Sequence, residues 1–407
     1  WKSTSCNRER EDNMTLLTAL FWTLLFIVFY AYAGYGILLY ILVKIKRLIS
    51  GKKNIFSKEF EPEVTLFVAA YNEKDYVDAK VANSLQLDYP ADKLKLVWVT
   101  DGSDDGTPEM LRKYPRLEVH HQPARAGKIG AMNRGMKLVN TPIVIFTDAN
   151  TMLNPEAIRN IVRHYENPKV GGVAGEKRIA AGKADAAAGA GEGIYWKYES
   201  ALKRRDSELY SVVGAAGELF SVRTPLFHEV EKDTLLDDFI LTMRITQQGY
   251  LVRYEPDANA TETSSANVEE ELKRKIRISA GGLQSVARLK PLLNIFRYGT
   301  LSFQYISHRV LRWTLAPLAL PFIFLINLLI AMNQGLGSLN LYSILFWGQV
   351  LFYLAALAGW YLENRKLKVK VLFVPYYFFI MNLSVYLGLR RLIKGRQSVN
   401  WERAKRA

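Results

Sequence analysis

The sequence contains a single cysteine, Cys6, among its 407 residues. One cysteine cannot close a disulfide within the chain or build a cysteine-based metal site, so both are excluded. The chain also lacks a phosphate-binding P-loop, although Gly127 and Lys128 form a Gly-Lys pair. Gln122 stands where that motif needs its first glycine, and Ile129 stands where it needs Ser or Thr.

Charged residues are missing from two long stretches, 14–43 and 313–362. A membrane-spanning helix needs about 20 apolar residues, so the first stretch fits one long or tilted span. It is longer than the apolar part of a signal peptide, and we therefore expect a retained anchor. The second stretch fits two spans around the polar residues 333–338, and a further run at 371–389 has the minimum length. Four membrane-associated segments are thus expected around one polar block.

The net charge of +15 would suit nucleic acid, but much of it lies beside the apolar runs, so no nucleic-acid partner is expected. By the positive-inside rule, the basic loops at 44–58 and 365–370 are cytoplasmic. The polar block then lies inside, and the protein is expected in the cell (inner) membrane as a multi-pass protein. Because the tail 390–407 is also basic, either 371–389 is interfacial or re-entrant, or the tail breaks the rule.

These patterns divide the chain into successive segments. Residues 291–313 mix aromatic and basic side chains, which suits helices lying at the membrane surface. The expected segments are an extracytoplasmic tail (1–13), a transmembrane anchor (14–44), a cytoplasmic domain (45–290), interfacial helices (291–313), transmembrane spans (314–332 and 341–362), a span or re-entrant segment (371–389) and a basic tail (390–407).

The polar block alternates between β-rich runs and helical patterns. The predicted strands are 64–70, 96–100, 117–120 and 143–147, and the predicted helices are 76–87, 128–139 and 155–165. This rhythm predicts a parallel sheet wound with helices, with ligands at the carboxyl ends of the strands. Polar residues do follow the strands, namely Asn72, Glu73, Asp101 and Asp148. The Ala- and Gly-rich stretch 180–193 is either a mobile loop or a weak helix start.

Several of these polar residues suit specific chemistry. Asp101 opens an acidic, glycine-containing turn, which is either an ordinary helix cap or a nucleotide pocket whose carboxylate accepts from a base N–H. Lys128 at a helix start can meet a diphosphate. Asp148 and Asn150, one residue apart at a strand end, can hold a divalent cation. The acidic pair at 237–238 either complements a helix dipole or supplies a general base.

Together these motifs resemble those of the family-2 glycosyltransferases, specifically the membrane branch that includes the cellulose, chitin and hyaluronan synthases. The resemblance covers nearly the whole chain from about residue 62. It implies an α/β nucleotide-sugar-binding domain of the A-type, Rossmann-like fold plus α-helical transmembrane segments. The matching motifs are Tyr71-Asn72-Glu73, Asp101 with its Gly-Ser-Asp-Asp-Gly-Thr continuation, the set Arg125, Gly127, Lys128 and Asn133, Phe146-Thr147-Asp148, Gly214-Ala215-Ala216-Gly217-Glu218 and Asp237-Asp238.

The resemblance also implies roles for individual residues. It implies that Asp238, beside Asp237, is the general base. It also implies that Asp148 and Asn150 bind Mg²⁺ or Mn²⁺. The implied substrate-binding residues are Tyr71, Glu73, Asp101, Arg125, Lys128, Asp148, Glu218 and Arg277, of which the first three hold uridine. The implied reaction is one displacement with inversion at the anomeric carbon of a UDP-sugar, made by a cytoplasmic catalytic domain.

Two departures from the family pattern bear on function. Asn150 replaces the second metal-binding Asp, which predicts a lower metal affinity. The polymerising members carry the motif Gln-x-x-Arg-Trp, whose tryptophan stacks on the acceptor sugar. Residues 274–278 keep the arginine of this motif as Arg277 but have Ile278 in place of the tryptophan. Trp196 and Tyr198 are candidates to hold the acceptor sugar instead. A second near-match at 309–313 resembles that of ceramide glucosyltransferases, and we interpret it as a membrane-interface anchor.

The acceptor therefore stays open between two classes, a growing polysaccharide and a membrane lipid that receives a single sugar. A polymer would leave through a pore formed by this chain or completed by a partner subunit or a second copy. A third class, an inactive scaffold or transport subunit, would be expected to lose its acids. Asp101, Asp148 and Asp238 are all present, so the sequence favours an enzyme, and a polymerising one over one that adds a single sugar.

Overall fold

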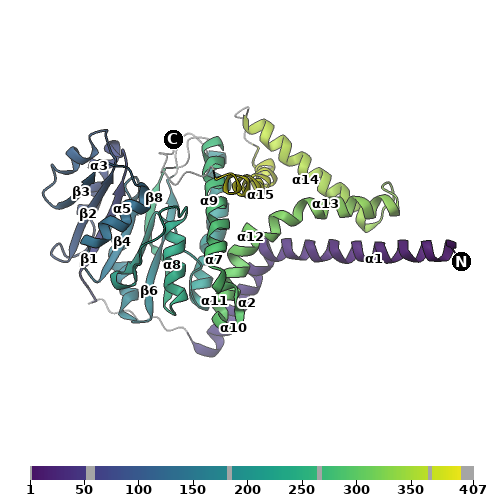
Figure 1. Ribbon diagram of the computed structural model, residues 1–407, viewed down its shortest axis with the longest axis horizontal. Coiled ribbons are helices and arrows are strands. Elements are labelled where there is room, and N and C mark those ends of the chain that lie inside the picture. Colours follow the sequence, from purple (N-terminus) through teal and green to yellow (C-terminus); the bar gives the residue numbers. More distant parts are fainter. Residues whose placement is uncertain (1, 52–59, 181–185, 264–267, 365–368, 396–407) are drawn as a thin grey trace.

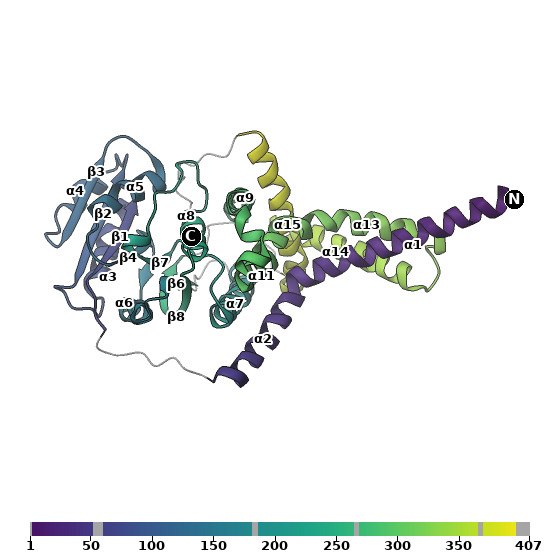
Figure 2. The same ribbon diagram turned by 60° about the horizontal axis from the view of Figure 1, so that its bottom comes forward.

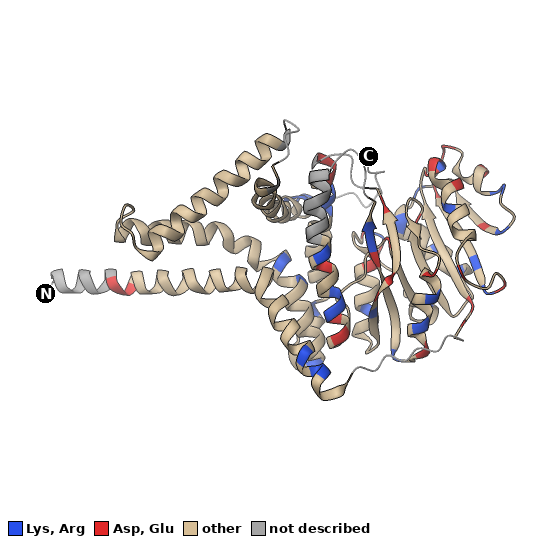
Figure 3. Ribbon diagram, turned by 180° about the vertical axis from the view of Figure 1, so that it is seen from behind, with Lys and Arg blue, Asp and Glu red and all other residues tan. Residues whose placement is uncertain are grey.

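The computed structural model describes residues 2–51, 60–180, 186–263, 268–364 and 369–395. A mixed α/β domain lies at one end, and long apolar helices extend away from it (Figure 1). Lys, Arg, Asp and Glu gather on the sheet domain and the helices next to it, whereas most of α1 (Lys2–Phe29), α13 (Leu315–Gln334) and α14 (Leu341–Asn364) carries none (Figure 3).

The sheet has eight strands in the order β3-β2-β1-β4-β7-β6-β8-β5 among the described residues. The parallel arrangement predicted for the first four strands is confirmed, because β1 pairs in parallel with β2 and β4, and β2 with β3. β7 runs antiparallel to β4 and β6, so the complete sheet is mixed rather than parallel. The strands are β1 (Val64–Ala70), β2 (Leu94–Asp101), β3 (Leu117–Gln122), β4 (Ile143–Asp148), β5 (Met152–Leu153), β6 (Val170–Ile179), β7 (Leu219–Arg223) and β8 (Leu251–Glu262).

Strand β6 was not predicted, because its glycine residues are unfavourable in a strand. Glycine normally weakens a strand unless another part of the chain approaches closely. A Cβ on Gly171 would lie 2.6 Å from Ile245 Cγ2, and one on Gly175 would lie 2.7 Å from Leu219 Cδ2. The small residues that argue against a strand in the sequence are therefore required by its packing.

The helices of the domain match the expected positions, with shifted ends. The predicted helix 76–87 is α3 (Lys74–Leu85), and that at 128–139 is α5 (Gly127–Gly135) followed by one 3₁₀ turn. The helix predicted at 155–165 is α6 (Ala157–Val162), again with a 3₁₀ turn. In the Ala- and Gly-rich stretch, helix α7 (Ala186–Leu209) starts at residue 186, and residues 181–185 lie outside the described part.

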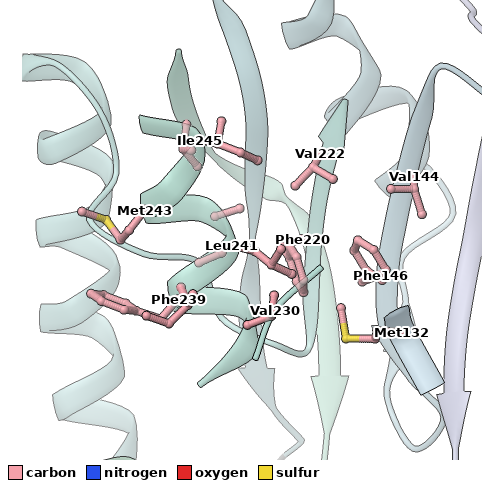
Figure 4. Close-up of a cluster of buried hydrophobic side chains, with 14 of the residues drawn as sticks. Met132, Val144, Phe146, Phe220, Val222, Val230, Phe239, Leu241, Met243 and Ile245 are labelled. Atoms are coloured by element: carbon pink, nitrogen blue, oxygen red, sulfur yellow. The ribbon is translucent and has the colours of Figure 1, made fainter. Parts of the chain in front are cut away.

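The core next to the site anchors helix α8 (Asp237–Gln247), which begins with the acidic pair. Phe239, Leu241, Met243 and Ile245 of α8 are buried with side chains of β4 and β7 (Figure 4). Gly214 has a φ of 83°, and a Cβ there would lie 2.0 Å from Phe239 Cδ2. Only glycine suits that combination of backbone angle and close approach. The N-terminus of α8 is thus held in place by close packing.

Four helices in the described part of the chain are long and apolar enough to cross a membrane: Glu11–Ser50, Leu315–Gln334, Leu341–Leu362 and Val371–Ile393. The first comprises α1, a π-helical turn (Tyr30–Gly34) and α2 (Tyr35–Ser50). Between the sheet domain and α13, residues 290–313 form a series of short helices. Tyr305 and His308 in this series are fully buried, so the segment also packs into the protein.

Helix α15 (Lys370–Ile393) lies across the direction of α1 and α13, next to α9 (Val268–Arg288), in both Figure 1 and Figure 2. A Cβ on Gly388 would lie 2.8 Å from the backbone nitrogen of Ala280, so the two helices approach closely at this glycine. Ser279 and Ser384 are joined by a hydrogen bond of 2.8 Å between their hydroxyls. The α15 helix therefore packs on the sheet domain as well as on the apolar helices.

Candidate active site

The loops that follow β1 and β2 are tied together by hydrogen bonds. Asn72 Nδ2 donates to Asp104 Oδ1 over 2.8 Å, and the Asp104 backbone N–H donates to Asn72 Oδ1 over 3.0 Å. Asn72 has a φ of 54°, in the left-handed region that asparagine tolerates better than most residues. Glu73, which follows it, is buried. These contacts fix the strand-end edge where the sequence predicted a site.

Three residues of the predicted nucleotide pocket meet at this edge. The Arg125 guanidinium lies 3.7 Å from the centre of the Tyr71 ring. Asp101 Oδ2 accepts from the backbone N–H groups of Ala126 (2.8 Å) and Gly127 (2.7 Å), and Oδ1 lies 3.3 Å from an Arg134 nitrogen. Asp101 therefore holds the loop that leads into α5, a role that its sequence position did not reveal.

Lys128 lies at the centre of the acidic residues. Its Nζ donates to Asp148 Oδ1 over 2.8 Å and is 4.0 Å from Asp237 Oδ2. A Cβ on Gly217 would lie 3.4 Å from Asp238 Oδ2 and 3.5 Å from Lys128 Nζ, so this glycine leaves room beside both groups. Burial acts to lower the pKa of Lys128, but attraction to Asp148 and Asp237 outweighs it and raises the pKa. The amine stays a cation.

Asp238 has the electrostatics of a proton acceptor that works near neutral pH. Its Oδ1 accepts from the Phe239 backbone N–H over 2.8 Å. Burial, reinforced by the charge of Asp237 and opposed by Lys128, raises the pKa of Asp238 to about 7. A general base is most effective when its pKa lies near the working pH. The sequence prediction placed the base here, and the geometry gives that carboxyl a suitable environment.

The side-chain oxygen atoms at the site are suited to hold a divalent cation that takes its remaining ligands from a bound substrate. Asp237 Oδ2 is buried and has no hydrogen-bond partner among the described residues. Asp148 presents its carboxylate at the end of β4, two residues before Asn150. No group of three or more His, Cys, Asp or Glu within the described ranges could hold a metal alone. Mg²⁺ typically takes one or two carboxylates and completes its shell with phosphates and water, which this arrangement allows.

Glu218 is held by a lysine that the sequence did not single out. Lys177 Nζ lies 2.5 Å from Glu218 Oε1 and also contacts Glu262. Burial acts to raise the pKa of Glu218, but the charge of Lys177 outweighs it and holds the pKa well below its usual range. The Lys177 amine also lies 5.1 Å from the centre of the Trp196 ring. Since Lys177 comes from β6, only the fold brings it to this site.

A cavity of about 590 Å³ connects these residues to the apolar helices. Its polar end is lined by Lys128, Asp148, Glu218 and the two acids at the start of α8. Its other walls come from α7, α9 and α15, and from Tyr32 in the π-helical turn of the first long helix. Apolar side chains of α15 that line it are Phe373, Val374, Tyr377, Phe378, Met381 and Val385.

The segment 309–313 is part of this cavity, which goes against its interpretation as a membrane-interface anchor. Arg309 and Arg312 both pair with the buried Glu199, at 2.5 and 3.4 Å. Trp313 lies edge-on to Phe239 with 5.1 Å between ring centres. All three side chains line the cavity, and so do Arg277 and Ile278. The chain therefore places an aromatic ring at the site even though residue 278 is isoleucine.

Comparison with known proteins agrees with this reading of the fold and the motifs. Residues 62–281, more than half of the chain, match the family model described as "Glycosyltransferase like family 2". A poly-β-1,6-N-acetyl-D-glucosamine synthase of Staphylococcus aureus (strain MSSA476) is 25% identical over 262 residues. That of Staphylococcus epidermidis is 24% identical over 238 residues, 55% of this chain and 56% of its relative. The match to the S. aureus protein covers 62% of each chain, so this chain spans less than two thirds of that relative's length.

A solved structure shares the architecture over most of the chain. The mannosyltransferase from Pyrobaculum calidifontis in complex with GDP-Man and Mn²⁺ is 21% identical and has a TM-score of 0.69. The superposition covers 94% of this chain and 100% of the other. The predicted α/β domain with apolar helices is thereby confirmed as a known fold.

Proposed function

This chain belongs to glycosyltransferase family 2, and on that premise we propose that it transfers a sugar from a nucleotide-sugar, a UDP-sugar, to a growing polysaccharide at the membrane. The observation that carries the proposal is the cavity in which Lys128, Asp148 and the pair Asp237-Asp238 meet, and which continues to α15. The relatives named as polysaccharide synthases support the choice of acceptor.

In this proposal the transfer is a direct displacement with inversion at the anomeric carbon. A hydroxyl of the acceptor attacks that carbon while Asp238 takes the hydroxyl proton, and the bond to the nucleoside diphosphate breaks. Lys128, a cation at the site, offsets negative charge on the leaving diphosphate. Mg²⁺ or Mn²⁺ held by Asp148 and Asn150 would neutralise the same diphosphate. Asp237 supports the raised pKa of Asp238.

Tyr71, Asp101 and Arg125 would bind the nucleoside in the pocket at the ends of β1 and β2. The pocket is nearly closed, because Arg125 lies over the Tyr71 ring and Asp101 holds the adjoining loop. Donor binding then requires Arg125 to leave the Tyr71 ring so that a base can take its place. Arg125 would remain close enough to contact the phosphates.

The proposal is tested by giving purified protein a panel of radiolabelled nucleotide sugars and sizing the labelled product. Incorporation of one sugar into products of increasing length is expected. A product with a single added sugar would favour the second candidate, transfer to a membrane lipid, which the apolar wall on α15 supports. Absence of transfer from every donor, in protein that binds nucleotide, would contradict both.

Replacing Gly282 is expected to disturb the acceptor side of the cavity. A Cβ at this position of α9 would lie 2.4 Å from Trp313 Cδ2, so Gly282→Ala must displace the indole. Displacement of a positioning group by about 1 Å can cost about 100-fold in rate, and we expect kcat/KM to fall by about 10- to 100-fold. Gly348→Ala is the control, because nothing lies within 4 Å of its added Cβ. Equal kcat/KM in both variants would exclude Trp313 from acceptor positioning.

The proposed orientation places the catalytic domain in the cytoplasm and the loop at 333–340 outside. In a Cys6→Ser background, Ser338→Cys is expected to react with an impermeant thiol reagent on intact cells. Lys113→Cys, exposed on the sheet domain, is expected to react only after the cells are opened. The reverse labelling pattern would contradict this topology.

A further inference from the structure

Two of the cations that line the cavity have no acidic partner in the described part of the chain. Eight Lys and Arg side chains line the cavity, against five Asp and Glu. Six of the eight form ion pairs: Lys128, Lys177, Arg274, Lys275, Arg309 and Arg312. The two that remain are Lys203 on α7 and Arg277 on α9, and no hydrogen bond is found for either within the described residues.

Lys203 is the more deeply placed of the two. It is only 4% exposed, and it forms no ion pair with any residue that the structure describes. Burial lowers its pKa, while the field of Glu199 opposes that effect. A buried ammonium ion without a partner is costly, and such a group is normally paired with an anion. An anion delivered by a ligand in the cavity would remove that cost.

The donor diphosphate already has its counter-charges elsewhere in the proposed reaction. Lys128 and Asp148, the carboxylate that would hold a divalent ion, lie at the strand-end edge of the sheet, next to the nucleotide pocket. Lys203 belongs instead to the wall formed by α7, where its amine lies 5.8 Å from the centre of the Trp196 ring. An anion bound there would belong to the acceptor.

The wall next to these cations is apolar. Helix α15 contributes Phe373, Phe378 and Met381 to the cavity, and this helix is itself apolar enough to cross a membrane. Helix α15 contacts both α9 and α7, at the junction of the sheet domain and the apolar helices (Figure 1). A ligand that matches both the two cations and the apolar wall has an anionic group next to an apolar chain.

We propose that Lys203 and Arg277 bind the phosphate of a lipid-phosphate-linked acceptor, whose apolar chain lies along α15. This inference rests on the proposed function and specifies its acceptor, because it places the growing saccharide on a lipid carrier. Sugar transfer still occurs at a hydroxyl next to Asp238, and the phosphate serves as the group by which the acceptor is held.

Binding of radiolabelled farnesyl phosphate to the purified full chain in detergent tests the inference. Saturable binding is expected, with farnesol and inorganic phosphate competing at least about tenfold more weakly, because each lacks one half of the ligand. Lys203→Gln and Arg277→Gln should each weaken farnesyl phosphate binding by about tenfold or more. Lys203→Arg should retain it, and Lys113→Gln, on the surface of the sheet domain, should not change it.

Nucleotide-sugar binding, measured on the same preparations, shows that each variant is folded and that its donor site is intact. Farnesol binding as tight as that of farnesyl phosphate, or unchanged affinity in both Gln variants, would overturn the inference. Sugar transfer to a soluble saccharide, which lacks the lipid phosphate, should keep its kinetics in Lys203→Gln and Arg277→Gln. An equal loss of transfer with that soluble acceptor would overturn the inference, while leaving the glycosyltransferase function in place. Loss of all transfer by the parent protein would instead refute the proposed function.

Discussion

Asp238→Asn is expected to slow sugar transfer by about 10²- to 10⁴-fold, the usual contribution of a general base. The amide cannot accept the proton of the attacking hydroxyl, yet it has the same shape and keeps an oxygen for the Phe239 N–H. Nucleotide-sugar affinity should therefore change little. Single-turnover kinetics together with equilibrium donor binding separate the two effects.

Asp92→Asn, on the exposed surface, is the matched control for this substitution and should behave as the parent. The parent rate should rise with pH through about 7, because the carboxylate form that accepts a proton grows above the pKa of Asp238. Turnover of Asp238→Asn within a few-fold of the parent would remove this residue from the base role.

Removal of divalent cations is expected to abolish transfer, and Mg²⁺ or Mn²⁺ should restore it. Asp148→Asn should reduce kcat by about 10²- to 10³-fold, comparable to the loss of one preorganised charge-stabilising group. The substitution removes both the proposed metal ligand and the anion that pairs with Lys128. Initial rates over a metal titration measure both effects.

Asn150→Asp adds a carboxylate to the loop from which Asp148→Asn removes one. A second carboxylate should strengthen apparent metal binding without abolishing activity, since it adds charge where the amide now stands. Full activity of the parent in excess chelator, or a metal titration unaltered by both substitutions, would contradict the proposed metal site.

The sequence was sufficient for the first half of the sheet and for the acidic residues of the site. The strands β1, β2 and β4 are short apolar runs that end at or just before polar residues, whereas β3 is a partly buried strand at the edge of the sheet. Parallel strands bring those ends to one edge. In the second half of the sheet, strand β6 and the antiparallel pairing of β7 were not predicted, because β6 depends on glycine packing and β7 pairs with strands that are distant in the sequence. Local sequence patterns indicate neither close packing at a glycine nor pairing between distant strands.

The acceptor side of the cavity was the least predictable part of the site. Ile278 stands at the position where the family pattern has its tryptophan, and the alternative motif that contains Trp313 was interpreted as an anchor. The structure places both residues on the cavity wall. Lys177 and Lys203 have no motif of their own. They reach the site because β6 and α7 line the same cavity as the acidic residues at the start of α8.

The most direct test of the central claim, one displacement at the anomeric carbon next to Asp238, is the anomeric configuration of the product. NMR of the first linkage made from the accepted nucleotide sugar should show a configuration opposite to that of the donor. The same product should be absent with Asp238→Asn over the same reaction time. Retention of the donor's configuration would contradict a single displacement, because it requires two displacements or a different mechanism.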